Sequence, residues 1–185
     1  LCAHGRLLYQ RADYSGSLRQ YQRAFRLDPQ ATFVLADIVA LASHLDRPAM
    51  AARYALLASG REGMQADLLR QLALFLTEQE DYDGAIRLYE LLDADEDGKP
   101  RDPSYVLMHY ELGRLYFLTQ QYPKSASSYA VVRAALEQPK DFGLTESTAK
   151  LLLGDPAVTY SVMGESFFRA GRPLGAIALF RKADE

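Results

Sequence analysis

The stretch Asp81-Tyr82-Asp83-Gly84-Ala85-Ile86-Arg87-Leu88-Tyr89 reads as a tight turn followed by an amphipathic helix. An aromatic residue lies in the turn, a small residue follows three positions later, and a second aromatic residue follows four positions after that. The same pattern recurs in three other stretches of the chain, at residues 13–21, 121–129 and 172–180. A unit that occurs several times in one chain indicates a repeat protein.

The small residue of this motif measures the period of the repeat. Ser17, Ala51 and Ala85 lie 34 residues apart, and the next copies, Ser125 and Ala176, follow after 40 and 51 residues. Six residues are therefore inserted after the third unit and 17 after the fourth. A period of 34 residues with two helices per unit is typical of a helical solenoid.

The residues that recur at this period resemble the tetratricopeptide repeat (TPR) family. In that family helix A carries a Leu-Gly pair and a Tyr, an aromatic turn follows, and helix B carries a small residue, an aromatic residue and a second small residue. The fourth unit shows Leu112-Gly113, Tyr116, Tyr122, Ser125 and Tyr129. The first, third and fifth units show similar sets, whereas the second is degenerate and is identified mainly by its register.

The resemblance implies an all-α, right-handed superhelical solenoid of about five TPR-like helix-turn-helix repeats. We expect a single array over residues 1–185, with repeats at about 1–31, 32–65, 66–99, 106–139 and 157–185 and insertions at 100–105 and 140–156. The expected A helices are about 1–11, 32–45, 65–79, 104–119 and 157–170. The expected B helices are about 15–27, 48–59, 83–94, 123–137 and 173–184.

Packing explains why these residue types recur. We expect Gly5, Gly113 and Gly164 of helix A to face small residues of helix B, so that the two helices approach closely. Rings such as Tyr21 and Tyr129 are then expected to fill the gap between one unit and the next. A single unit cannot bury its apolar faces alone, so the stable object is the array.

The insertion at 140–156 is expected to hold one more short helix. Thr145 or Ser147 could cap its start, and Gly154-Asp155-Pro156 would end it. The insertion either folds over the groove as a plug or packs on the last repeat, and the sequence does not decide between the two.

Composition narrows the class of protein further. The 185 residues are 49% hydrophobic, which excludes a disordered chain, and the net charge of −3 makes nucleic acid a poor partner. One cysteine excludes a disulfide framework, and no apolar run approaches the roughly 20 residues of a membrane span. Both ends fall inside repeat units, so we expect a piece of a longer protein. Compartment and oligomeric state are not predicted.

No motif in the chain predicts catalysis or a cofactor. His4, His44 and His109 lie on different repeats without a ligand or nucleophile partner at helical spacing. Gly-x-Gly-x-x-Gly, the phosphate-loop lysine motif and Gly-x-Ser-x-Gly are all absent. We therefore do not expect an enzyme.

An acidic stretch gives a weak calcium-loop candidate. Asp93, Asp95 and Asp97, followed by Gly98, match the first half of an EF-hand loop, but Ser104 stands where the bidentate acid is needed. The alternative is an acidic, solvated loop, which we favour.

The stronger candidate site is the face of helix A that lines the concave groove in the TPR family. Positions on this face recur at helical spacing and avoid the contact with helix B. Arginine and aromatic side chains are enriched at protein interfaces, so these residues could hold a peptide; the alternative is packing between neighbouring A helices and local ion pairs. The candidates are Arg6, Tyr9, Arg70, Leu74, Tyr110, Arg114, Phe117, Glu165 and Phe168.

Chaperone-binding TPR proteins hold a C-terminal carboxylate with Lys, Asn and Arg on successive A helices. The corresponding positions here are Cys2, Arg6, Asp37 and Arg70, of which only Arg70 fits. Asp37 would repel a carboxylate, which speaks against such a clamp.

We therefore expect a protein- or peptide-binding scaffold or adaptor that uses the concave face. The alternative is a structural or regulatory TPR segment of a larger enzyme or a secretion or assembly machine, whose chemistry lies outside these residues. The sequence does not name the partner or the pathway.

Overall fold

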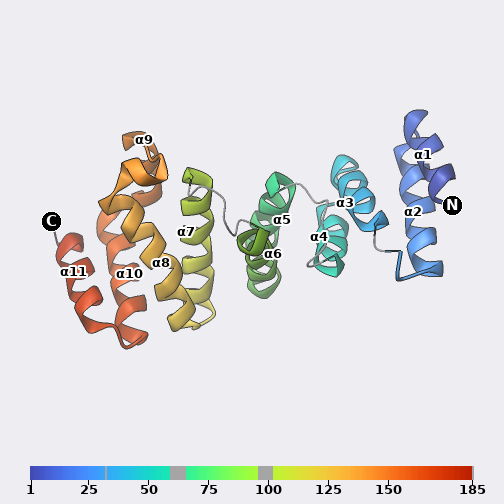
Figure 1. Cartoon of the computed structure of the whole chain (residues 1–185). Helices are drawn as coiled ribbons and strands as arrows, with labels where there is room; N and C mark the ends of the chain where they lie inside the picture. Colours follow the sequence, from blue (N-terminus) through green and yellow to red (C-terminus); the bar gives the residue numbers. More distant parts are fainter. Residues whose placement is uncertain (32, 59–65, 96–101, 185) are drawn as a thin grey trace. The chain divides into compact units, whose positions relative to one another are not determined.

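The computed structural model describes residues 1–31, 33–58, 66–95 and 102–184. Within these residues the chain forms eleven α-helices, one short 3-10 helix and no strand, which confirms the predicted all-α helical-repeat fold (Figure 1). The chain divides into two compact units, Leu1–Asp95 with α1 to α6 and Glu96–Glu185 with α7 to α11. That both units belong to one array with the repeat bounds given above stays a prediction.

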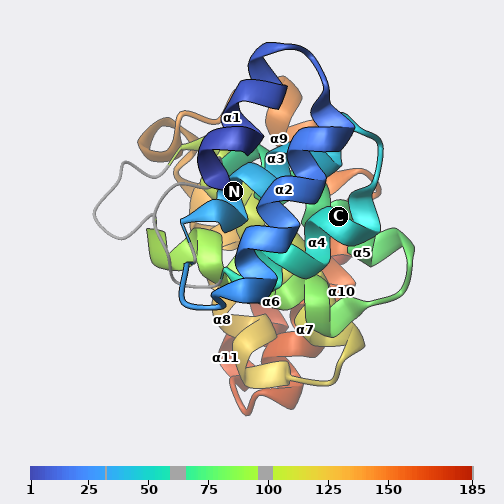
Figure 2. The same ribbon diagram turned by 90° about the vertical axis from the view of Figure 1, so that its right-hand side faces the viewer.

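The first unit consists of three helix pairs. The pairs are α1 (Cys2–Gln10) with α2 (Tyr14–Leu27), α3 (Val34–His44) with α4 (Pro48–Leu57), and α5 (Ala66–Glu78) with α6 (Tyr82–Asp95). The helices of each pair pack side by side, as α1 and α2 do in both views (Figures 1 and 2). Between pairs, α2 packs on α3 and α4 packs on α5.

The second unit consists of two pairs and the insertion between them. The pairs are α7 (Pro103–Leu118) with α8 (Tyr122–Glu137) and α10 (Pro156–Arg169) with α11 (Pro173–Ala183). Here α8 packs on α10. In both units the first helix of each pair is an A helix and the second is a B helix, and all ten predicted helices are present.

The turn between helices A and B has the same backbone conformation in every pair. A left-handed residue occurs at one repeat position, in Ala12, Asp46, Glu80, Gln120 and Gly171, with φ of 58, 54, 61, 60 and 73°. These residues follow one another at the same intervals as the small residues of the motif, Ser17, Ala51, Ala85, Ser125 and Ala176. Only the fifth pair has glycine at this position. In the other four turns a residue with a side chain adopts the left-handed conformation, which is unfavourable for any residue other than glycine.

The N-termini of the helices show ordinary capping interactions. The Asp13 Oδ1 accepts a hydrogen bond from the Gly16 N–H at 2.8 Å, and the Asp81 Oδ1 accepts one from the Gly84 N–H at 3.0 Å. Proline occupies the first turn of α4, α8 and α11, as predicted, because a missing N–H costs nothing there.

The glycine of helix A makes room for the aromatic ring of its own B helix. A Cβ added at Gly113 would lie 2.7 Å from the Tyr129 ring, and one at Gly164 would lie 2.7 Å from the Phe180 ring. Our expectation that the glycines simply face small residues was therefore incomplete. The small residue instead contacts the glycine carbonyl, which accepts a hydrogen bond from the Ser125 Oγ at 2.7 Å in the fourth repeat.

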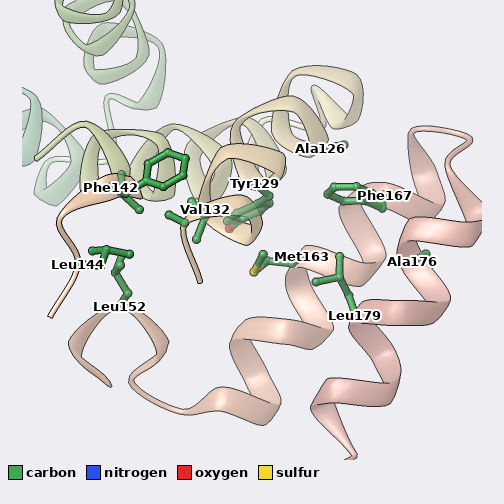
Figure 3. Close-up of a cluster of buried hydrophobic side chains, with 12 residues drawn as sticks. Ala126, Tyr129, Val132, Phe142, Leu144, Leu152, Met163, Phe167, Ala176 and Leu179 are labelled. Atoms are coloured by element: carbon green, nitrogen blue, oxygen red, sulfur yellow. The ribbon is translucent and has the colours of Figure 1, made fainter. Parts of the chain in front are cut away.

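The insertion belongs to the core of the second unit. It forms the 3-10 helix η1 (Pro139–Phe142) and the predicted helix, α9 (Glu146–Leu153), whose N-cap is Thr145. Phe142, Leu144 and Leu152 are buried in one cluster with Val132 and Met163 (Figure 3).

The position of α9 distinguishes the two roles considered for the insertion. The Thr159 Oγ1 donates to the Leu153 carbonyl at 2.6 Å, and α9 contacts α7 and α10. Because Thr159 lies in the first turn of α10, this contact is at the N-terminal end of that helix. The insertion therefore packs on the repeats of the second unit.

Candidate binding face

Each A helix carries a stripe of exposed and half-buried side chains, and we call this stripe the A-face. It comprises four positions per A helix, which lie six and three residues before, and one and four residues after, the glycine position of the repeat. Large apolar side chains on this stripe are unusually open to solvent: Tyr9 is 55% exposed, Leu74 45% and Phe168 61%. Exposed large apolar side chains also occur outside this stripe, such as Leu118 on α7 and Leu174 on α11.

In the first unit the A-face contains a pocket between α1, α2 and α3. It has a volume of about 260 Å³ and is lined by Arg6, Tyr9, Gln10, Tyr21, Asp37, Ala40 and Leu41. Two of the predicted site residues, Arg6 and Tyr9, are thus brought together at one place.

Three polar groups converge at the floor of this pocket. The phenol of Tyr21, the guanidinium of Arg6 and the carboxylate of Asp37 all line it. Burial and the negative charge of Asp37 raise the pKa of Tyr21, while Arg6 partly opposes this shift. Because its pKa is raised, Tyr21 is a neutral phenol at neutral pH.

Aromatic contacts hold the Tyr9 side of the pocket in place. The Tyr9 and Tyr14 rings meet edge to face with centroids 5.4 Å apart, and Tyr14 meets His44 of the next repeat in the same way at 4.5 Å. Such pairs contribute about 0.5–1.5 kcal/mol beyond area burial. The exposed Tyr9 ring is therefore supported by its contact with Tyr14, which in turn contacts His44.

The other two predicted residues of the first unit lie on α5, outside this pocket. The Arg70 Nη1 is 2.8 Å from the Asp67 Oδ1, one turn earlier on the same helix. Leu74 is exposed beside it on the A-face. Arg70 therefore already has a local carboxylate partner, as the alternative interpretation of the arginines anticipated.

The second unit brings the remaining predicted residues onto two A helices. Tyr110, Arg114 and Phe117 lie on α7, and Glu165 and Phe168 lie on α10. The Arg114 Nη2 is 2.9 Å from the Glu111 Oε2, and the Arg169 Nε is 2.5 Å from the Glu165 Oε1. The charges of this face are thus paired within their own helices, while the Phe168 ring is exposed.

The second unit also repeats the aromatic contact of the first. The Phe117 and Tyr122 rings meet edge to face at 5.8 Å, and the Arg169 guanidinium lies 5.1 Å from the centroid of Tyr122. By repeat position, Phe117 corresponds to Tyr9, Tyr122 to Tyr14 and Arg169 to His44. We call each of these sets an aromatic bridge, because it joins one repeat to the next.

Among the polar residues that line the pocket, Gln10, Tyr21 and Asp37 were not predicted as site residues. The motif assigned Tyr21 to packing, which its ring does perform beside Gly5. Asp37 was considered only as an obstacle to a carboxylate. The 34-residue period could have indicated that Asp37 shares a helix face with Ala40, but not that it lines the same pocket as Tyr21.

A second hollow opens at the junction between α4 and α5. It has a volume of about 530 Å³ and is lined by Ala49, Ala52, Arg53, Leu56, Leu57, Phe75, Leu76, Gln79 and Asp81. None of the predicted site residues lines it.

The calcium-loop candidate is only partly described. Asp97 lies outside the described residues, and the described part of the chain holds no cluster of three or more His, Cys, Asp or Glu suited to a metal ion. Calcium binding by Asp93, Asp95 and Asp97 stays a weak prediction. Separately, no described helix is long and apolar enough to cross a membrane.

Comparison with known proteins identifies the class of repeat. A family model described as tetratricopeptide repeat matches residues 70–138, which confirms the resemblance seen in the sequence. No curated protein matches the chain.

Solved structures of similar fold include the following three. BtubC (BKLC) from P. vanneervenii is 19% identical, with 97% of this chain and 75% of that chain covered and a TM-score of 0.51. MamA is 16% identical over 97% of this chain and 91% of that chain, with a TM-score of 0.45. YrrB, described as a TPR protein with an unusual peptide-binding site, is 15% identical over 98% and 82%, with a TM-score of 0.47. At these identities the likeness concerns the fold.

Proposed function

We propose that this chain binds a protein or peptide partner through the A-face of its helix pairs and acts as a scaffold or adaptor. The TPR fold supports an interaction role in general. The observation that carries the proposal is the repeated exposure of large apolar side chains on one face, including Tyr9 in the first unit and Phe168 in the second. Exposed rings near arginines are typical of interfaces.

The site residues have distinct roles in this proposal. Tyr9, Leu74 and Phe168 offer apolar surface, and Tyr110 and Phe117 support it from partly buried positions. Arg6 is available for hydrogen bonds from the pocket. The remaining charged residues, Arg70, Arg114 and Glu165, have partners within their own helices and would contribute mainly at the rim.

The chain offers a matched control for this proposal. Leu174 is 84% exposed, more than any of the proposed contact residues, but it lies at the start of the B helix α11. Replacing it removes a comparable apolar group without touching the A-face.

The test is peptide selection followed by affinity measurement. The full 185-residue chain is immobilised and random peptides displayed on phage are selected against it. Fluorescence anisotropy then gives the Kd of each selected peptide for the wild type and for Tyr9→Ser, Phe168→Ser and Leu174→Ser. We expect Tyr9→Ser or Phe168→Ser to weaken binding about tenfold or more, and Leu174→Ser to change it by less than about twofold.

Two results would count against the proposal. Failure to select any peptide would remove its basis, and a loss confined to Leu174→Ser would move the site to a B helix. In the first case the alternative, a structural or regulatory segment of a larger protein, would be preferred.

A further inference from the structure

The hollow between α4 and α5 lies in a different part of the first unit from the A-face. Its lining residues come from the B helix α4, from the C-terminal half of α5 and from the turn that follows α5. None of them occupies an A-face position, which on α5 are Asp67, Arg70, Leu74 and Thr77. What binds in the hollow is therefore a question separate from the proposed function.

The hollow has room for a small molecule and mostly apolar walls. Its volume of about 530 Å³ falls within the roughly 300–1,000 Å³ of small-molecule sites. Six of its nine lining residues are apolar, including Leu56 on α4 and Phe75 and Leu76 on α5. Leu57, at the same site, is 52% exposed. A hydrocarbon group bound here would remove apolar surface from water.

The polar residues of the hollow favour an anionic head group. The exposed Arg53 guanidinium forms no ion pair or hydrogen bond with any described residue, although Asp81 lines the same hollow. The Asp81 carboxylate is engaged elsewhere, because its Oδ1 accepts a hydrogen bond from the Gly84 N–H at 3.0 Å. The positive end of the α6 dipole beside Asp81 further disfavours a cation. A carboxylate, by contrast, would form a charge-assisted pair with Arg53.

The wall formed by α4 limits the length of the ligand. It extends from Ala49 to Leu57, which is about 12 Å along the helix axis. Arg53 lies midway, so a tail that starts at its guanidinium has about 6 Å of this wall on either side. This length suits a short alkyl chain and not a long one.

We infer that the hollow between α4 and α5 binds a short-chain alkyl carboxylate, with its carboxylate at Arg53 and its tail against Ala52 and Phe75. The ligand would fill space between a helix of the second repeat and a helix of the third. Because it binds the folded state, it would also stabilise the first unit.

Calorimetric titration of the 185-residue chain tests the chemistry of the ligand. Butanoate, hexanoate and octanoate should bind about fourfold more tightly for each methylene group added, and affinity should level off before dodecanoate, all below their micelle concentrations. Octanamide and octylammonium should bind at least about tenfold more weakly than octanoate. Equal binding of the three head groups, or affinity that keeps rising through dodecanoate, overturns the inference.

Filling the hollow tests the location of the tail. Ala52→Leu should weaken octanoate binding about tenfold or more while the chain stays folded by circular dichroism. Ala49→Leu, at an exposed position of the same wall, is the second filling variant in case Ala52→Leu does not fold. In the wild type, octanoate methyl protons should show nuclear Overhauser contacts to the Phe75 ring. Unchanged affinity in the folded filling variants overturns the inference.

A matched pair of arginines tests the location of the carboxylate. Arg53 and Arg87 are both exposed and occupy the same repeat position, on α4 and α6, but only Arg53 lines the hollow. Arg53→Gln should weaken octanoate binding about tenfold, whereas Arg87→Gln should change it by less than about twofold. Equal effects of the two substitutions would indicate general charge attraction and overturn the inference.

Two further results decide between this site and other readings of the same hollow. Tighter binding of N-acetylleucine than of octanoate would indicate a site for the C-terminus of a peptide and overturn the inference. Absence of binding by every alkyl carboxylate at millimolar concentration also overturns it. Neither result affects the proposed function, which is tested by peptides and by substitutions on the A-face.

Discussion

Two junctions inside the first unit follow the same period but pack differently. Between the first and second repeats, Leu18 and Tyr21 of α2 are buried in a cluster with residues of α3. Between the second and third repeats, the corresponding positions of α4 hold Ala52 and Ala55, and a hollow of about 530 Å³ opens beside α5. Register therefore follows the period. Packing differs at the Tyr21 position, which Ala55 occupies here and Tyr129 fills at the fourth-to-fifth junction, where Ala126 stands at the Leu18 position.

The aromatic bridges occur at the well-packed junctions and are missing from the junction beside the hollow. The first-to-second and fourth-to-fifth junctions each have one, centred on Tyr14 and Tyr122. At the second-to-third junction the corresponding residues are Ser43, Pro48 and Glu78, which cannot form such a contact. We call this the open junction and the other two the closed junctions.

The largest expected effect comes from opening a closed junction. Leu18→Ala should destabilise the first unit by about 2–5 kcal/mol, because Leu18 is 1% exposed and its loss leaves a cavity against α3. Urea unfolding together with hydrogen exchange of α2 and α3 amides measures the change. Ile177→Ala, at the same repeat position in the fifth repeat but 50% exposed, should cost less than about 1 kcal/mol. Equal effects of the two substitutions would contradict the assignment of Leu18 to a junction.

A smaller effect is expected from closing the open junction. Ala52→Leu should stabilise the first unit by about 1–2 kcal/mol, because Ala52 lines the hollow and the added methylene groups leave water. The control is Ala126→Leu at the same position of a closed junction, where Ala126 is fully buried and overpacking should cost about 1–3 kcal/mol. Thermal unfolding of both variants gives the signs, and destabilisation by Ala52→Leu would show that the hollow does not accept a side chain.

The smallest expected effect is the pH dependence of stability that comes from the buried phenol of Tyr129. Burial raises the pKa of Tyr129 above its ordinary value, so the folded state keeps the proton when the unfolded state has released it. Stability from this group is complete below about pH 10 and is lost as the pH rises further. Urea midpoints measured from neutral to alkaline pH should fall less steeply for Tyr129→Phe than for the wild type. The same slope in both would contradict the raised pKa.

The fold was predictable because its determinants are local and repeated. The spacing of Ser17, Ala51 and Ala85 fixed the first three pairs, and Thr145 with Gly154 located the extra helix of the insertion. The sequence did not show that the ring, and not the small residue, fills the space at Gly113, because that depends on how closely the two helices approach.

The candidate site was only partly predictable. Helical spacing placed Arg6 and Tyr9 on one face, but the pocket also needs Tyr21 and Asp37 from two other helices. Their proximity follows from the packing of α2 on α3, which no pattern within one helix encodes. The hollow between α4 and α5 was also not predictable from the sequence. Small residues such as Ala52 indicate missing side-chain volume, but they do not show whether the neighbouring helix moves in to fill it.

Amide chemical-shift mapping shows directly whether a partner binds the A-face. The isotope-labelled 185-residue chain is titrated with a peptide selected on it, and the shifted amides are assigned to helices. If partners bind the A-face, the largest shifts fall in α1, α3, α5, α7 or α10, and the B helices change little. Shifts concentrated in α2, α4, α6, α8 or α11 would contradict it.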